Sequence, residues 1–298
     1  MVHKKLSAYT VISNVVMMLV TISVILPFLL LFMSSITAED ALLTNGYSFL
    51  PKEFSVESYA YILRSGMKIL KAYGMTIVLT VVGTVINLGL SSLFAYPLSL
   101  RNLPYRRAIT FFVFFTMLFN GGLVPSYMMW TSIFHIKDTF WGLLLPNLLM
   151  GPMNVLMIRT YFANSIPAEL FEAAKIDGAG QLKIFTSIVL PLGKPILVTM
   201  GTFSGLAYWN DWTNGLYYIS RKTELYTIQN LLNRMVSDLQ YLATDANAAS
   251  TASEVFTRIP STGVQMAIAF VAILPIMILF PFLQKYYTKG IALGAVKG

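Results

Sequence analysis

Long stretches without any Asp, Glu, Lys or Arg constrain the fold of this chain more than any other feature. A helix of roughly 20 mostly apolar residues crosses the hydrocarbon core of a bilayer. Five stretches meet this length, and a sixth, 195–220, is interrupted only by Asp211. We therefore expect an all-α integral membrane protein with six transmembrane helices, near residues 12–36, 73–98, 108–132, 139–161, 195–218 and 260–283.

The composition excludes several classes of function. Only 11% of the residues are charged, whereas soluble domains carry about 25%. The chain has no cysteine and only two histidines, His3 and His135, so we expect neither a metal site nor a cysteine nucleophile. The net charge of +8 is spread over short tracts rather than one Lys/Arg cluster, so nucleic-acid binding is not expected.

The distribution of charge predicts the orientation. With the N-terminus inside, the inside segments hold twelve basic and three acidic residues, while the outside segments are neutral overall. Cytoplasmic loops carry such an excess of Lys and Arg. Both termini are therefore predicted to be cytoplasmic. The inside basic residues are Lys4, Lys5, Arg101, Arg106, Arg107, Arg159, Lys175, Lys183, Lys194, Lys285, Lys289 and Lys297.

The first apolar stretch, 6–38, is too long for the core of a signal peptide and lacks an A-x-A-like cleavage site, so a retained helix is predicted. We divide the chain into an N-terminal helix with its outer loop (1–72), a core domain with five transmembrane helices (73–283) and a cytoplasmic tail (284–298). The long outer segments, near 37–72 and 219–259, either contact an extracytoplasmic partner or, for the first, are simple connectors.

The inner segment 165–192 carries signals for two short helices. Ser165 is a suitable N-cap, and Pro167 suits a first helical turn. A helix is therefore predicted over 168–176, with Glu169 favoured near its positive end.

Glycine and proline divide the rest of this segment. Gly178 and Gly180 are expected to end the first helix. A second helix is predicted over 181–189, and Pro191 is expected to stop it. The segment is thus a helical hairpin on the cytoplasmic surface.

One face of the first short helix suits contact with a partner. Glu169, Glu172 and Ile176 fall on one side of the helix. Ala173 and Ala174 are small, so a partner surface can approach the backbone closely. The face either fits a groove on another protein or rests on lipid headgroups, and the residues alone leave both readings open.

The pattern of this segment resembles the EAA loop of binding-protein-dependent ABC importer permeases. Glu172-Ala173-Ala174, Asp177-Gly178-Ala179 and Ile188-x-Leu190-Pro191 match the family's EAA, its glycine after three intervening residues and its hydrophobic-Pro ending. The resemblance extends from about residue 73 to the C-terminus and implies the type I importer fold. The motif is long and its spacing is constrained.

The resemblance implies that the loop couples this chain to a separate cytoplasmic ATPase. The residues implied in coupling are Glu169, Glu172, Ala173, Ala174, Asp177, Gly178, Leu190 and Pro191. The chain contains no Gly-x-x-x-x-Gly-Lys-Ser/Thr loop for binding phosphate. We therefore expect ATP and Mg²⁺ on the ATPase, no cofactor on this chain, and no enzymatic activity of its own.

The family resemblance also implies an assembly in a prokaryotic cytoplasmic membrane. It consists of a second permease, usually a different chain in the sugar branch, two ATPase subunits and an extracytoplasmic solute-binding protein. Asp177-Gly178-Ala179, Leu190-Pro191-Leu192 and the tail 284–298 resemble the carbohydrate branch that contains the maltose permeases. The segment 258–263 resembles permeases for complex oligosaccharides. A sugar is expected, and a peptide, an amino acid or another solute is the alternative.

The fifth predicted helix, 195–218, gives a physical reason to expect a sugar. Sugars offer apolar C–H faces and hydroxyl groups, which aromatic and amide side chains bind. Tyr208, Asp211 and Trp212 would share one face of a continuous helix. An ionisable residue within a span defaults to a functional role. The predicted substrate pathway includes Tyr208, Asn210, Asp211, Trp212 and Asn214.

Other readings of this helix stay open. In one, Asp211 only pairs with a polar group of the second permease. In another, the aromatic residues form a belt at the membrane interface.

Polar and helix-breaking residues occur in other predicted spans as well. Interhelical hydrogen bonds are expected for Asn87, Asn120, Asn147 and Gln265. Breaks are predicted at 120–122 with Pro125 and at Pro146 and Pro152, and kinks at Pro275 and Pro281.

Two rival classes of function predict other features. An ion-driven secondary transporter would show paired inverted repeats with discontinuous helices, and the sequence has no convincing internal repeat. A membrane scaffold or sensor would not need the coupling loop.

Overall fold

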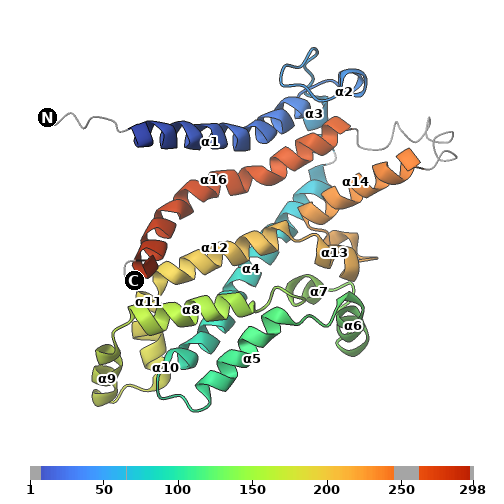
Figure 1. The fold of residues 1–298 in the computed structure, drawn as a ribbon. Coiled ribbons are helices and arrows are strands. Elements are labelled where there is room, and N and C mark those ends of the chain that lie inside the picture. Colours follow the sequence, from blue (N-terminus) through green and yellow to red (C-terminus); the bar gives the residue numbers. More distant parts are fainter. Residues whose placement is uncertain (1–7, 65, 245–261, 296–298) are drawn as a thin grey trace. The chain divides into compact units, whose positions relative to one another are not determined.

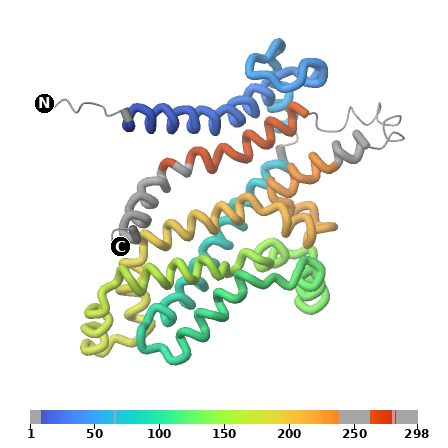
Figure 2. The backbone as a smooth tube through the Cα atoms, viewed as in Figure 1, coloured from blue at the N-terminus to red at the C-terminus, as the bar shows by residue number. Residues whose placement is uncertain are grey.

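The computed structural model describes the backbone of residues 8–64, 66–244 and 262–295 (Figures 1 and 2). Side chains are described over 9–64, 67–237, 262–278 and 281. Within these ranges the chain is helical, and its one β-type pairing is an isolated bridge between Thr37 and Phe54. The all-α prediction is confirmed.

The chain divides into two compact units. One contains residues 1–69 and 232–275, and the other contains residues 70–231 and 276–298. We call them unit 1 and unit 2. Three helices contribute residues to both units. They are α4 (Gly66–Ser99), α14 (Ile228–Thr244) and α16 (Thr262–Ala295).

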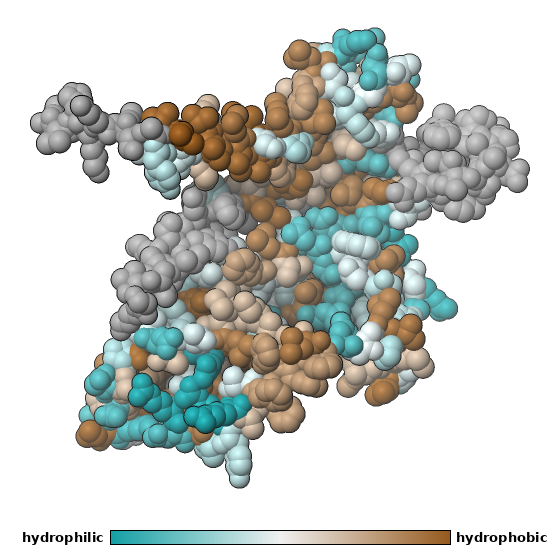
Figure 3. All heavy atoms as spheres, in the orientation of Figure 1, coloured by the Kyte–Doolittle hydropathy of each residue, from teal (hydrophilic) through white to brown (hydrophobic). Residues whose placement is uncertain are grey.

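Unit 1 begins with α1 (Ala8–Ser35), whose side chains form a hydrophobic surface along the helix (Figure 3). None of its most apolar window is buried, as expected for a helix that faces lipid. Two short helices follow, α2 (Glu39–Asn45) and α3 (Glu57–Arg64).

Hydrogen bonds connect α2 and α3 to the two longer helices of unit 1. Both carboxylate oxygens of Glu39 accept backbone N–H groups at the start of α16, from Thr262 and Gly263, each at 2.9 Å. The hydroxyls of Ser35 and Tyr59 lie 2.7 Å apart. The predicted outer loop 37–72 therefore contains α2, α3 and the first residues of α4.

Unit 2 contains the helices whose breaks the sequence predicts. After α4, the chain forms α5 (Arg106–Leu118), α6 (Leu123–Met128) and a π-helical turn, Met129–Ile133. The two halves bend by 110° at 119–122. Gly122 has φ +88°, a conformation that favours glycine.

The fourth predicted span is also broken. It consists of α7 (Phe140–Leu144) and α8 (Pro152–Ser165), with Pro146 between them. The next span consists of α12 (Lys194–Asn210) and α13 (Thr213–Tyr218). We expected the latter to be continuous, and that prediction is wrong.

The described residues contain between two and four candidate membrane spans. Tyr9–Ser35 and Met67–Ser99 are each long and apolar enough to cross a membrane, and the number reaches four if two bent pairs count as one span each. These pairs are 106–118 with 123–133, and 181–192 with 194–210, the latter bent by 79°. Thr262–Ile278 is apolar but shorter. The count of six stays a prediction.

The remaining outer and terminal segments differ from simple loops. A 3₁₀ turn, Thr223–Leu225, and α14 occupy much of the second outer segment. Residues 245–261 lie outside the described residues. They include most of 243–253, a stretch rich in Ala, Ser, Thr and Asn. They also include most of 258–263, the segment that resembles oligosaccharide permeases. The predicted tail is helical to Ala295, as a continuation of α16.

Candidate functional site

The segment predicted to lie inside forms a helical hairpin, which begins with α9 (Ala168–Ile176), with the bounds predicted from the sequence. Pro167, not Ser165, is its N-cap residue, since Ser165 still belongs to α8. At the other end, the N–H of Gly178 bonds to the carbonyl of Lys175, and the N–H of Ala179 bonds to that of Ala174. These two bonds form a Schellman motif. The motif requires the left-handed φ of +75° at Gly178.

The second half of the hairpin is longer than predicted. It consists of α10 (Gln181–Ile184), a π-helical turn (Phe185–Val189) and α11 (Leu190–Leu192). Pro191 does not stop the helix, because it lies in the first turn of α11, where no N–H is needed. The chain turns at Gly193, where a Cβ would lie 2.5 Å from the Phe162 ring.

Tertiary contacts fix the hairpin on the core of unit 2. Ala174, Ile184, Phe185 and Val189 are buried in a cluster with residues of α4, α8 and α12. Within this cluster, the Tyr96 hydroxyl donates to Oε1 of Gln181 at 2.7 Å. The Tyr96 ring lies 5.4 Å from the ring of Phe185. A force on the hairpin would therefore reach three long helices directly.

The surface of α9 that faces away from the core is open to a partner. Glu169, Glu172 and Ala173 are exposed, and Ile176 is 86% exposed. Ala174, by contrast, is 9% exposed and packs inward. The two alanines of the motif thus differ in accessibility, because Ala173 is open to a partner and Ala174 contacts the core. Asp177, Gly178 and Pro191 are also exposed, and Leu190 is half-buried.

The break between α12 and α13 is organised by Asp211. Its Oδ1 accepts the backbone N–H groups of Thr213 at 3.1 Å and Asn214 at 3.3 Å, as a residue that caps a helix does. The helix spacing that placed Tyr208, Asp211 and Trp212 on one face does not apply across this break. Oδ2 of Asp211 is buried and has no hydrogen-bond partner among the described residues.

Two of the predicted pathway residues are buried and bond to backbone carbonyls. Tyr208 is 1% exposed, and its hydroxyl donates to the carbonyl of Leu144 at 3.0 Å. Asn214 is 2% exposed, and its Nδ2 donates to the carbonyls of Pro146 at 3.0 Å and Leu143 at 3.4 Å. Both satisfy carbonyls that the end of α7 leaves free.

Asn210 and Trp212 are the predicted pathway residues with exposed side chains. Asn210 ends α12, and Trp212, which is 42% exposed, precedes α13. Asp211 lies between them and is half-buried. The structure thus separates the five predicted residues into an accessible group, Asn210 and Trp212, the partly buried Asp211, and a buried pair, Tyr208 and Asn214.

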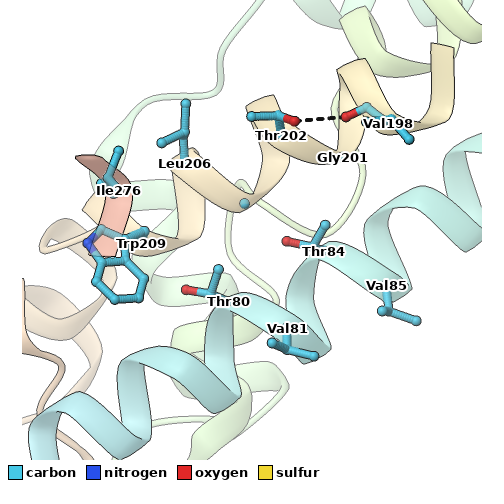
Figure 4. A pocket seen from close by; sticks show the side chains of 11 residues that line it. Thr80, Val81, Thr84, Val85, Val198, Gly201, Thr202, Leu206, Trp209 and Ile276 are labelled. Atoms are coloured by element: carbon cyan, nitrogen blue, oxygen red, sulfur yellow. Dashed lines mark hydrogen bonds between the residues drawn. The ribbon is translucent and has the colours of Figure 1, made fainter. Parts of the chain in front are cut away.

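A pocket of about 460 Å³ lies between α4 and α12 (Figure 4). Gly201 and Gly205 let α12 come close to α4, since a Cβ at Gly201 would lie 3.0 Å from Leu88. The Thr202 hydroxyl donates to the Val198 carbonyl (Figure 4). The Thr80 and Thr84 hydroxyls, although in its wall, are shielded from the surface. The pocket thus offers an apolar lining without the polar groups that a sugar needs.

Comparison with known proteins decides the family. Residues 6–293 match the family described as binding-protein-dependent transport system inner membrane component. The chain belongs to this family. It is therefore a permease subunit of ABC importers and not an enzyme, as predicted.

Related permeases match over almost their full length. The Bacillus subtilis protein LplC is 35% identical over 92% of this chain and 90% of its own. The B. subtilis polygalacturonan/rhamnogalacturonan transport system permease protein YtcP is 34% identical over 92% and 93%. A chain of a bacterial ABC transporter for import of the acidic polysaccharide alginate has a TM-score of 0.79 and 27% identity, over 96% of this chain and 99% of that chain. The permease thus has the type I importer fold.

A buried polar network connects three helices of the permease. Oδ1 of Asn87 accepts from Nδ2 of Asn154 and from the Ser204 hydroxyl, each at 2.9 Å. Nδ2 of Asn87 donates to the carbonyl of Leu148 at 2.7 Å, in the break before α8. The interhelical role predicted for Asn87 is confirmed. Asn154 and Ser204 could not be singled out, because their partners lie far away in the sequence.

A clamp formed by Asp138 holds two loops of the permease together, one before α7 and one after α13. Oδ1 of Asp138 accepts backbone N–H groups of Ser220 at 2.7 Å, Arg221 at 2.8 Å and Lys222 at 3.3 Å. The bond from Arg221, with those from Ser220 and Lys222, lowers the pKa of Asp138 to about 2 although desolvation acts against it. Asp138 has φ +53°, so this tertiary clamp also fixes an uncommon backbone conformation.

Proposed function

We propose that this permease forms half of the translocation pathway of an importer for an oligosaccharide. ATP would be hydrolysed on two separate ATPase subunits, and an extracytoplasmic binding protein would deliver the sugar. The second permease would be a different chain. The protein would cross the cytoplasmic membrane six times, with both termini in the cytoplasm.

The observation that carries the transport proposal is the exposed face of α9 on a rigid base. Glu169, Glu172 and Ile176 point away from the core, while Ala174 and the π-helical turn 185–189 are packed into it. A surface fixed in this way can pass a movement of an ATPase to α4, α8 and α12. A loop that rested only on lipid headgroups would not need this buried base.

The proposal of an oligosaccharide rests on the relatives. YtcP is named as a permease for polygalacturonan/rhamnogalacturonan. The B. subtilis permease AraQ, which is 27% identical over 98% of this chain, is named for arabinooligosaccharides. The structural neighbour belongs to an alginate importer. These cargoes are all carbohydrates, which favours a sugar over a peptide or an amino acid.

Within the pathway, we assign contact with the sugar to the accessible group at the break of the fifth span. Asn210 and Trp212 have exposed side chains, one with an amide and one with an aromatic face. Asp211 lies between them and holds the break through its Oδ1, which accepts two backbone N–H groups. Such a combination can contact both the hydroxyls and the C–H faces of a sugar.

The assembled transporter with its binding protein allows a direct test of both parts. We expect its ATPase activity to rise when the binding protein is loaded with its oligosaccharide. Uptake into proteoliposomes should require ATP on the side of the membrane that carries the ATPase subunits. Stimulation by peptides or amino acids alone would contradict the sugar assignment. Uptake driven by an ion gradient without ATP would favour a secondary transporter.

The coupling surface is tested by Glu172→Arg. Reversal of this exposed charge is expected to abolish uptake while the protein still inserts into the membrane. Glu57→Arg, which changes an exposed carboxylate outside the hairpin, is the matched control. Normal uptake and normal co-purification of the ATPase in Glu172→Arg would contradict the assignment.

A further inference from the structure

A second pocket of unit 2, about 840 Å³ in volume, lies where α5 begins. The connection from α4 to α5, the first turns of α5 and one face of α8 form its wall, and α5 packs against α8. Figure 1 shows these two helices next to each other. Four arginines line the pocket: Arg101, Arg106, Arg107 and Arg159.

These four positive charges lack a counter-charge. The sequence contains no Asp or Glu in 58–137 or in 139–168. Among the described residues, no ion pair involves any of the four guanidinium groups. Nε of Arg159 donates to the carbonyl of Leu98 at 3.2 Å, and the neighbouring charge that acts on it is the like charge of Arg106. Gathering unpaired cations at a partly enclosed site is unfavourable, so an anion would stabilise it.

The start of α5 adds to the positive potential. Arg106 and Arg107 occupy its first turn, where the helix dipole disfavours cations. The N-cap residue, Tyr105, has φ +55° and provides no side-chain hydrogen bond to the free N–H groups. An anion at this position would offset the charge of the arginines and interact with the end of the helix.

The rest of the pocket is apolar. Leu103, Phe111, Phe114 and Leu156 line it beside the arginines. Phe111 is 58% and Phe114 46% exposed, so the apolar wall continues onto the surface of a predicted membrane helix. A free phosphate ion would use only the arginines, whereas a phospholipid offers an anionic headgroup and acyl chains together.

We propose that this pocket binds an anionic phospholipid, with its phosphate held by the arginines and an acyl chain along Phe111 and Phe114. A guanidinium group can donate two parallel hydrogen bonds to two oxygens of one phosphate. Basic pockets between membrane helices on the cytoplasmic side suit such headgroups. That the pocket lies on this side rests on the proposed orientation, because Arg101, Arg106 and Arg107 belong to the predicted inner loop.

Native mass spectrometry of the assembled transporter can count the lipids that it retains. The complex is exposed to equal amounts of phosphatidylglycerol and phosphatidylcholine. We compare the unchanged chain with Arg101→Gln/Arg106→Gln/Arg107→Gln and with the control Arg64→Gln/Arg221→Gln, whose arginines lie outside the pocket. Each cation near an anionic lipid strengthens binding roughly fivefold, so the triple variant should bind phosphatidylglycerol about a hundredfold more weakly.

Further arms of the experiment distinguish the occupants. The triple Lys variant should retain much of the binding, because it keeps the charge, and retention of phosphatidylcholine and of the ATPase shows that each variant is assembled. Equal retention of phosphatidylglycerol by the Gln variant and the control would overturn the proposal. So would displacement by millimolar inorganic phosphate, or retention only after the ATPase subunits are removed. The readout involves neither sugar nor ATP hydrolysis, so its failure is distinct from a failure of the proposed function.

Discussion

The hairpin 168–192 and the break of the fifth predicted span are both irregular, but different forces shape them. In the hairpin, Gly178 ends α9 through bonds between neighbours in the sequence. At the break, Asn214 bonds to carbonyls of Leu143 and Pro146, about seventy residues earlier. Local chemistry defines the first region and distant partners define the second. The predictions below test this difference.

The largest effect is expected for Gly178→Pro. Proline fixes φ near −65° and has no N–H, while this position has φ +75° and donates to Lys175. We expect ATP-driven uptake to fall to background. Gly180→Ala is the control, because Gly180 has φ −68° and open space around its Cα. Similar uptake by the two variants would show that the Schellman motif is not needed.

Asn214→Leu should destabilise the permease by about 1–3 kcal/mol, because two buried carbonyls lose their donor. Asn210→Leu, four residues earlier and exposed, should change stability by less than about 0.5 kcal/mol. Thermal unfolding of the purified complex measures both. Equal losses would mean that the break is held by its local sequence, as the hairpin is.

Tyr96→Phe should weaken the base of the hairpin by about 1 kcal/mol, since it removes one hydrogen bond to Gln181. Faster hydrogen exchange is expected over 168–192. The control is Tyr105→Phe, which changes a tyrosine that is 82% exposed. Unchanged exchange in Tyr96→Phe would place the support of the hairpin in its apolar contacts alone.

The smallest effect concerns the clamp formed by Asp138. The pKa of Asp138 is lowered to about 2 in the folded protein and is about 3.9 in an unfolded chain. Its contribution to stability is therefore complete above about pH 4 and is lost as the pH falls toward 2. The melting temperature of the unchanged permease should fall more steeply over this range than that of Asp138→Asn. Parallel curves would contradict the role of this clamp.

The sequence predicted those features that local signals define. The bounds of α9, the turn at Gly178 and the breaks at 119–122 and between α7 and α8 follow from glycine, proline and the spacing of apolar residues. The end of α12 at Asn210 was missed, because its stretch of the sequence reads as a continuous apolar helix. The roles of Tyr208 and Asn214 were also missed, since carbonyls of another helix define them. Pro191 was misread because proline fits the first turn of α11.

The central claim is that α9 presents one face to an ATPase and the other to the core of the permease. Ala173 and Ala174 are adjacent, but only Ala173 is exposed. Because the chain has no cysteine, Ala173→Cys and Ala174→Cys each introduce a single thiol. A short thiol-to-amine reagent should cross-link the ATPase subunit to residue 173 and not to residue 174 in the assembled transporter. No product at 173, or equal products at both positions, would contradict the account.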